Sequence, residues 1–221
     1  MSLESQRSAR LEDPGAEALD RMQTLWERYG RIALGVVIAA AAIGALAFFS
    51  LRARAASEDA ASGKLAEADL LFWQGDYARS LTVARQVSEQ YPSTPSGIDA
   101  HRIAGDDHYW MGDFKSAADE YKRYLDKQST GSLADGVRRS YAYALESSNR
   151  SKDAAPLYDG LVGKFDRESS AEFLSAASRC YVASGQKAEA VKRLQRILDE
   201  FGETSVANSA RVRLAELQAS N

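Results

Sequence analysis

The side chains of this chain whose types suit chemistry are two histidines, one cysteine and one adjacent acidic pair. His101 and His108 stand seven residues apart on one expected helix. Two histidines that grip one zinc ion from a helix usually stand about three or four residues apart, so that both face the ion. We therefore expect both histidines to pack inside the protein, and we expect no metal site.

The acidic pair and the cysteine also favour a structural interpretation. Asp106 and Asp107 are neighbours on the same expected helix, where adjacent side chains point about 100° apart and do not share a site. Cys180 precedes Tyr181 on an apolar helix, which is typical of an inert buried thiol. The sequence offers no glycine-rich phosphate loop and no nucleophile–base arrangement. We predict that the protein is not an enzyme and has no cofactor.

The composition excludes further classes. A net charge of −3 argues against nucleic-acid binding, because phosphate contacts need a basic face. The chain has four prolines and no alternating runs rich in Val, Ile and Thr of the kind that strands require. The sequence therefore predicts an all-α protein.

The longest apolar feature runs from Ile32 to Leu51, 20 residues without a charged side chain. At about 1.5 Å per residue such a helix reaches about 30 Å, the thickness of the hydrocarbon core of a bilayer. Trp26 and Tyr29 lie just before the run, where aromatic rings favour the membrane interface. The run predicts a single transmembrane helix, with the lipid bilayer as a partner.

Two questions about this run stay open. A cleavable signal peptide is the alternative, because Ala53-Arg54-Ala55 fits the small-residue cleavage pattern, although the run is longer and starts later than such peptides do. The topology is the second question, because arginines flank both ends equally. We expect the short N-terminal tail inside and the long domain exported.

The remainder of the chain contains a repeat of 36 to 37 residues. The segment 75–77, Gly-Asp-Tyr, returns as Gly-Asp-Phe at 112–114, and each glycine is followed by a small residue, Ser80 and Ala117. The same steps lead to Asn149 with Ala154 and to Gly185 with Ala190. Each unit is expected to be a helix, a tight turn and a second helix, which meet at the small residues.

The ends of these helices are marked by capping residues. Asp76, Asp113 and Ser151 are the expected N-caps of the second helices. Thr94 followed by Pro95 predicts another helix start. The segment 204–219 places apolar residues on one stripe and is expected to cap the end of the solenoid.

The pattern resembles the tetratricopeptide repeat, which has a small residue, Gly before Tyr, then Ala, Tyr and a closing Pro. The second unit, with Gly105, Gly112, Phe114, Ala117 and Tyr121, matches well, whereas the third and fourth units are degenerate. The resemblance implies an all-α fold, with the single transmembrane helix followed by a tetratricopeptide-like helical-hairpin solenoid. Such solenoids bind protein partners on the inner face that the first helix of each unit forms.

A surface that combines aromatic side chains with Arg and Asp is typical of a binding site. The alternative for Trp73 and Trp110 is that they fill the gap between units. By the register of the repeat, the expected partner-binding residues are Asp69, Phe72, Trp73, Asp99, Arg102, Asp106, Tyr109, Trp110, Arg139, Tyr143, Glu146 and Arg179.

Two further resemblances concern the layout of the whole chain. Trp26-x-x-Tyr29-Gly30, an apolar span and degenerate repeats together resemble the single-span ancillary subunit of the bacterial Sec translocon. The segments 91–95 and 201–204 look like connections between repeats in the cell-division coordinator of the Tol–Pal system and in outer-membrane assembly lipoproteins. They imply a single-pass protein of the bacterial inner membrane, with a cytoplasmic N-terminus and a periplasmic repeat domain.

The expected organisation is a partly disordered cytoplasmic tail at 1–24, a transmembrane helix with flanks at 25–55, about four repeats at 56–203 and a capping helix at 204–221. We expect a membrane-anchored adaptor that binds an integral membrane complex through its span and soluble or unfolded polypeptide through its repeats. A permanent accessory subunit of a large membrane assembly is the alternative. Protein partners and lipid are expected, and nucleic acid is not.

Overall fold

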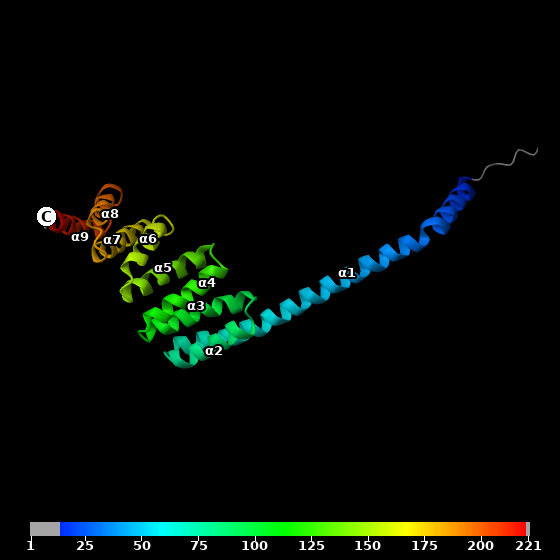
Figure 1. The fold of residues 1–221 in the computed structure, drawn as a ribbon, viewed down its shortest axis with the longest axis horizontal. Coiled ribbons are helices and arrows are strands. Elements are labelled where there is room, and N and C mark those ends of the chain that lie inside the picture. The colour runs from blue at the N-terminus through cyan, green and yellow to red at the C-terminus, as the bar shows by residue number, and fades with distance from the viewer. Residues whose placement is uncertain (1–13, 220–221) are drawn as a thin grey trace, which may run out of the picture. The chain divides into compact units, whose positions relative to one another are not determined.

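The structure, a computed structural model, describes residues 14–219, and all the regular elements in that range are helices (Figure 1). The chain divides into two units, the first ending at Ala55 and the second beginning at Ala56. The first helix, α1 (Pro14–Trp73), contributes to both units.

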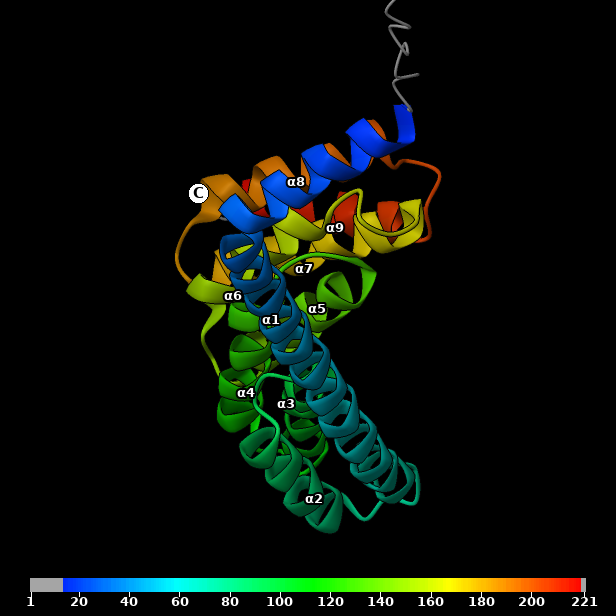
Figure 2. The same ribbon diagram turned by 90° about the vertical axis from the view of Figure 1, so that its right-hand side faces the viewer.

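In the first unit, α1 is exposed along almost its whole length. It is long and apolar enough to cross a membrane, and its apolar part packs against nothing in the structure. The helix begins at Pro14, so it extends into the segment for which we expected a partly disordered tail; residues 1–13 of that tail lie outside the described residues. Figure 2 shows that α1 changes direction within its dark-blue beginning.

The second unit is a series of antiparallel helical hairpins, as the repeat predicts. The part of α1 from residue 56 to 73 forms the first helix of the first hairpin. The other helices are α2 (Tyr77–Gln90), α3 (Pro95–Trp110), α4 (Phe114–Lys127), α5 (Ser132–Ser147), α6 (Ser151–Leu161), α7 (Arg167–Ala183), α8 (Lys187–Glu200) and α9 (Val206–Ala219). Consecutive helices pack side by side, and α9 packs on α7 and α8 (Figures 1 and 2).

The turn inside each hairpin has the same backbone geometry. Gly75, Gly112, Asn149 and Gly185 take φ values of 81°, 81°, 62° and 77°, the left-handed region that favours glycine and tolerates asparagine. The next amide returns to the carbonyl of the preceding helix, as in Arg150 N to Leu145 O at 2.8 Å. This is a Schellman motif, so the recurring glycine ends the first helix of each unit.

The expected N-caps are confirmed in three of four cases. Asp76 and Asp113 accept hydrogen bonds from the backbone amides three residues later, and Thr94 accepts one from Gly97 N with Pro95 in the first turn. Ser151 is not a cap. It is the first residue of α6, one position too late, and Arg150 occupies the N-cap position equivalent to that of Asp76 and Asp113 without a side-chain hydrogen bond.

Small and large residues alternate in the core that joins the hairpins. Ala117, Ala154 and Ala190 are fully buried, as the repeat predicts for positions where two helices touch. Tyr121 and Tyr158 lie at equivalent positions and are also buried. The core ends at α9, whose buried residues are Ala207, Ala210, Leu214 and Leu217.

Hydrogen bonds to acidic side chains join successive hairpins at the start of a helix. Glu58 accepts hydrogen bonds from Ser96 Oγ at 2.6 Å and Ser96 N at 3.1 Å. Glu168 likewise accepts hydrogen bonds from the hydroxyl and the backbone amide of Ser205, and the amide nitrogen lies 3.0 Å from Glu168 Oε1. Both contacts satisfy a backbone amide in the first turn or just before it, where a helix has unpaired donors.

Candidate partner-binding face

The predicted acidic residues of the first two hairpins lie around one guanidinium. Arg102 donates two hydrogen bonds to Asp99, of 2.7 and 2.8 Å, and one to Asp106, of 3.2 Å. Asp69, from the first hairpin, lies within electrostatic range of Arg102 and Asp99. Three carboxylates therefore share one cation, and this cluster has a net negative charge when all of its groups are ionised.

Burial sets the proton affinities in this cluster. Burial raises the pKa of Asp106, and it outweighs the hydrogen bond from Tyr121 and the charge of Arg102, which act in the opposite direction. Burial also raises the pKa of Asp69. For Arg102, burial alone would lower the pKa, but the hydrogen bond and charge of Asp99 raise it, so this side chain stays a cation. Arg102 thus positions two carboxylates.

Exposed aromatic rings lie at the turn end of the same helices. Trp73 is 82% exposed and Trp110 is 63% exposed, so most of each side chain faces solvent. Trp110 stacks on Tyr77 of the preceding hairpin with ring centres 6.1 Å apart and planes within 14°. The Phe72 ring contacts Trp73 in an edge-to-face arrangement and Tyr77 at a tilt. We call Phe72, Trp73, Tyr77 and Trp110 the aromatic ridge.

Beside the ridge is a small hollow of about 160 Å³. Tyr109 and Tyr143, both predicted, face it from different hairpins. Tyr121 also faces it and donates its hydroxyl proton to Asp106 Oδ1 at 2.7 Å. The sequence reasoning missed Tyr121 and Ser140 as lining residues, because the repeat pattern assigns Tyr121 to helix packing and gives its hydroxyl no direction. The hollow is lined by Asp106, Tyr109, Trp110, Tyr121, Ser140 and Tyr143.

The predicted residues of the third and fourth hairpins are less concentrated. Arg139 is exposed and lies over the ring of Phe165 at 5.4 Å, so it does not enter the hollow. Glu146 and Arg179 form an ion pair at 3.2 Å that links α5 to α7. Tyr158 donates a hydrogen bond to Glu146 at 2.6 Å. This region is more basic than the Arg102 cluster.

A larger groove of about 510 Å³ lies at the C-terminal end of the same face, between α7 and α9. Arg179 borders it, together with Ser178, Val212 and Arg213. The predicted face therefore has one hollow between the second and third hairpins and one groove at its C-terminal end.

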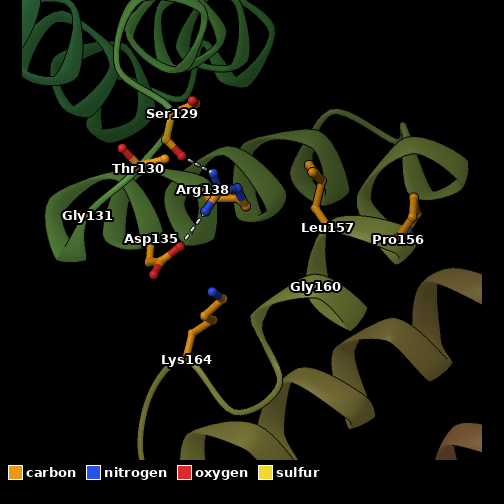
Figure 3. A pocket seen from close by; sticks show the side chains of 9 residues that line it. All are labelled: Ser129, Thr130, Gly131, Asp135, Arg138, Pro156, Leu157, Gly160 and Lys164. Carbon is orange, nitrogen blue, oxygen red and sulfur yellow. Dashed lines mark hydrogen bonds and ion pairs between the residues drawn. The ribbon is translucent and has the colours of Figure 1, made fainter.

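The pocket in Figure 3 is elsewhere, between the segment 129–131, α5 and the end of α6. Its volume is about 420 Å³, and Arg138 crosses it to bind Asp135 and the Ser129 carbonyl, the latter at 2.8 Å. Lys164 points into it from the turn after α6 (Figure 3). None of the predicted partner-binding residues lines this pocket.

The residues that first suggested chemistry have structural roles. His101 is buried with Nδ1 2.8 Å from Glu120 Oε2, and His108 is buried with Nε2 3.0 Å from Arg85 Nη2. Burial lowers the pKa of His108. Cys180 is buried, and burial raises its pKa to about 12, so the thiol stays protonated. Among the described residues no group of acidic, histidine and cysteine side chains could hold a metal.

Asp107 is separated from its neighbour Asp106, as helical geometry requires. It is fully buried against α2, and neither carboxylate oxygen has a hydrogen-bond partner in the described part of the chain. Burial raises the pKa of Asp107 to about 7, the charges of Asp106 and Asp69 add to this, and the Ser80 hydroxyl opposes it. Asp107 is thus a buried carboxyl in the contact between two hairpins.

Comparison with known proteins agrees with this architecture. The family model of the tetratricopeptide repeat matches residues 174–204, which cover most of α7 and α8. No curated protein matches the sequence. The degenerate fourth unit is thus the one that the family model detects.

Solved structures show the same fold at low sequence identity. A kinesin light chain of Podosopora anserina with nearly identical TPR-like repeats has a TM-score of 0.56 and 17% identity, over 72% of this chain and 86% of that one. A tetratricopeptide repeat protein of Parabacteroides merdae has a TM-score of 0.61 and 14% identity, over 73% and 61%. MamA of Desulfovibrio magneticus has a TM-score of 0.53 and 13% identity, over 73% and 96%. This chain therefore has a tetratricopeptide-like helical repeat fold.

Proposed function

We propose that this protein is a membrane-anchored adaptor whose repeats hold protein partners at a complex of the bacterial inner membrane. The observation that carries the proposal is the aromatic ridge beside the Arg102 cluster. Interface energy concentrates in a few aromatic and Arg anchors that become desolvated on binding. Trp73 and Trp110 expose large rings to solvent, and such surfaces usually mark an interaction site.

The anchor is the segment 32–51. Its side chains are exposed and uncharged, and the segment is long enough to cross a bilayer as a helix. The resemblance to the Sec ancillary subunit supports a cytoplasmic N-terminus and a periplasmic repeat domain. In this arrangement the span binds the integral membrane complex, and the repeats hold a soluble or unfolded polypeptide.

Tetratricopeptide-like folds serve mainly as protein-interaction modules, which supports a function without catalysis. The alternative is a permanent accessory subunit in which the repeat face plays no part in binding. The two functions differ in stoichiometry, because a fixed subunit occurs in constant ratio with one complex. An adaptor instead shows a varied set of clients.

The test is crosslinking of the full chain in membranes, followed by purification in mild detergent and mass spectrometry. The double variant Trp73→Ala/Trp110→Ala should lower client capture at least tenfold, since anchors cost upwards of about 1–2 kcal/mol each. Leu133→Ala, which truncates an exposed apolar side chain outside the predicted face, is the matched control and should keep capture.

A companion variant tests the predicted residues of the second and third hairpins. Tyr109→Ala/Arg139→Ala should weaken capture while circular dichroism stays helical. If both double variants keep full binding and deletion of residues 32–51 abolishes it, the adaptor function is wrong. The span would then be the functional surface, as the accessory-subunit alternative requires.

A further inference from the structure

The part of α1 that precedes the apolar run has two distinct faces. Residues 18–31, which we call the juxtamembrane helix, carry the large apolar side chains Leu19, Met22, Leu25, Trp26 and Tyr29. At about 100° per residue, these five fall within an arc of about 120°. The rest of the circumference carries Asp20, Arg21, Gln23, Thr24, Glu27, Arg28 and Arg31.

Nothing in the first unit covers this apolar arc. Leu19 is 68% exposed and Trp26 is 67% exposed. The Trp26 ring leans along the helix over Gly30, where an added Cβ would lie 3.1 Å from it. The ring therefore broadens the apolar arc at the point where the juxtamembrane helix meets the uncharged run.

The length of the helix indicates what covers the arc. From Ala18 to Leu51 the helix would measure about 50 Å, whereas the hydrocarbon core is about 30 Å thick. The uncharged run from Ile32 fills that thickness by itself. The juxtamembrane helix must then either project into water with its apolar arc bare or lie along the membrane surface.

We propose that the juxtamembrane helix lies in the membrane interface, with its apolar arc in the lipid. This rests on the proposed span, with whose apolar surface the arc is continuous. Arg21 and Arg28 stand at one border of the arc, where long basic side chains reach phospholipid headgroups while their stems stay apolar. The expected lipid is therefore anionic.

The change of direction of α1 in its dark-blue part agrees with a helix that leaves the line of the span (Figure 2). An interfacial helix of this kind would fix how the span emerges from the bilayer. A second copy of the chain is the competing occupant, because an apolar arc can also form a coiled coil.

The test uses the full chain in nanodiscs of phosphatidylcholine and phosphatidylglycerol, with one spin label at a time. Cys180→Ala removes the native thiol, and cysteines replace Leu19, Asp20, Met22, Gln23, Trp26 and Glu27 in turn. We expect labels at 19, 22 and 26 to be accessible to oxygen, which dissolves in lipid. Labels at 20, 23 and 27 should be accessible to a water-soluble nickel chelate.

Three results would overturn the proposal or part of it. Equal exposure of all six labels to the nickel chelate would mean that the helix projects into water. Dipolar broadening between copies at 19 and 26 would identify a second copy as the occupant. A label at Ile38→Cys separates the two proposals: if it contacts lipid while the six do not, the span holds and only the interfacial helix is wrong.

Discussion

Tyr121 of α4 packs its ring directly on Gly105 of α3, so closely that a Cβ at position 105 would lie 2.6 Å from Cδ1 and Cε1. The ring cannot move aside easily, because it is 2% exposed and its hydroxyl is bonded to Asp106. The contact joins the two helices of the second hairpin and sets one wall of the hollow.

The first prediction follows from this contact. Gly105→Ala should overpack the hairpin and lower stability by roughly 1–3 kcal/mol, measured by urea unfolding. Gly136→Ala is the matched control, since position 136 also lies inside a helix but an added Cβ meets nothing within 4 Å. The control should stabilise by roughly 0.5–1 kcal/mol. Equal effects of the two changes would contradict the packing.

The second prediction concerns Asp107 and pH. Its pKa is raised to about 7, so the folded state binds a proton more tightly than the unfolded state, whose carboxyl titrates near 4. Stability from this group is therefore full below about pH 4 and is lost as the pH rises through about 7. His108, whose pKa burial lowers, contributes with the opposite sign, so the contribution of Asp107 is read from the difference between the thermal melts of the parent and of a matched variant.

The matched variant for Asp107 is Asn, which has a similar shape and no charge. Asp107→Asn should flatten the dependence between about pH 4 and 7 and raise the melting temperature at pH 8. Asp119→Asn, at an exposed position on α4, should leave the profile unchanged. A parent and an Asp107→Asn variant with the same slope would show that this carboxyl is not the group that titrates.

The third prediction concerns the contact between the third and fourth hairpins. Arg193 of α8 bonds Asp159 of α6 at 2.7 Å and lies 4.5 Å over the ring of Tyr181, which itself donates to Asp159 at 2.7 Å. Arg193→Ala should cost roughly 1.5–3 kcal/mol, because a half-buried carboxylate loses its cation.

Lysine should not restore this contact fully, since it lacks the planar fork that both bonds and stacks. Arg196→Ala, which breaks an exposed ion pair with Glu200 on the same helix, is the control and should stay within about 0.5 kcal/mol. If Arg193→Ala and Arg196→Ala unfold at the same urea concentration, the Arg193 network adds no stability.

The fourth prediction concerns the turn of the third hairpin. Asn149 has a φ of 62°, where the other turns have glycine. Asn149→Gly should be neutral or slightly stabilising, whereas Asn149→Val should lose roughly 1–2 kcal/mol, because a β-branched residue fits this conformation poorly. Thermal unfolding measures both. A valine variant as stable as the glycine variant would mean that the turn is not left-handed.

The sequence by itself determined the features that depend on local chemistry and spacing. The uncharged run predicts a helix long enough to span a bilayer from composition alone. The glycines of the repeat predict the Schellman turns, because a positive φ is a property of a single residue. Asp76, Asp113 and Thr94 identify three helix starts for the same reason, and Ser151 fails because it lies one residue past the N-cap position, which Arg150 occupies.

Only the tertiary structure decided the features that depend on how far one hairpin stands from the next. The repeat register places Arg102 and the tryptophans on one face, and helical spacing brings Asp99 and Asp106 to Arg102. The sequence cannot tell that Asp69 of another hairpin joins them or that Trp73 is exposed. The burial of Asp107 likewise depends on α2, a helix of another hairpin. These properties arise from distances between side chains that are remote in sequence, and a periodic pattern contains no such distances.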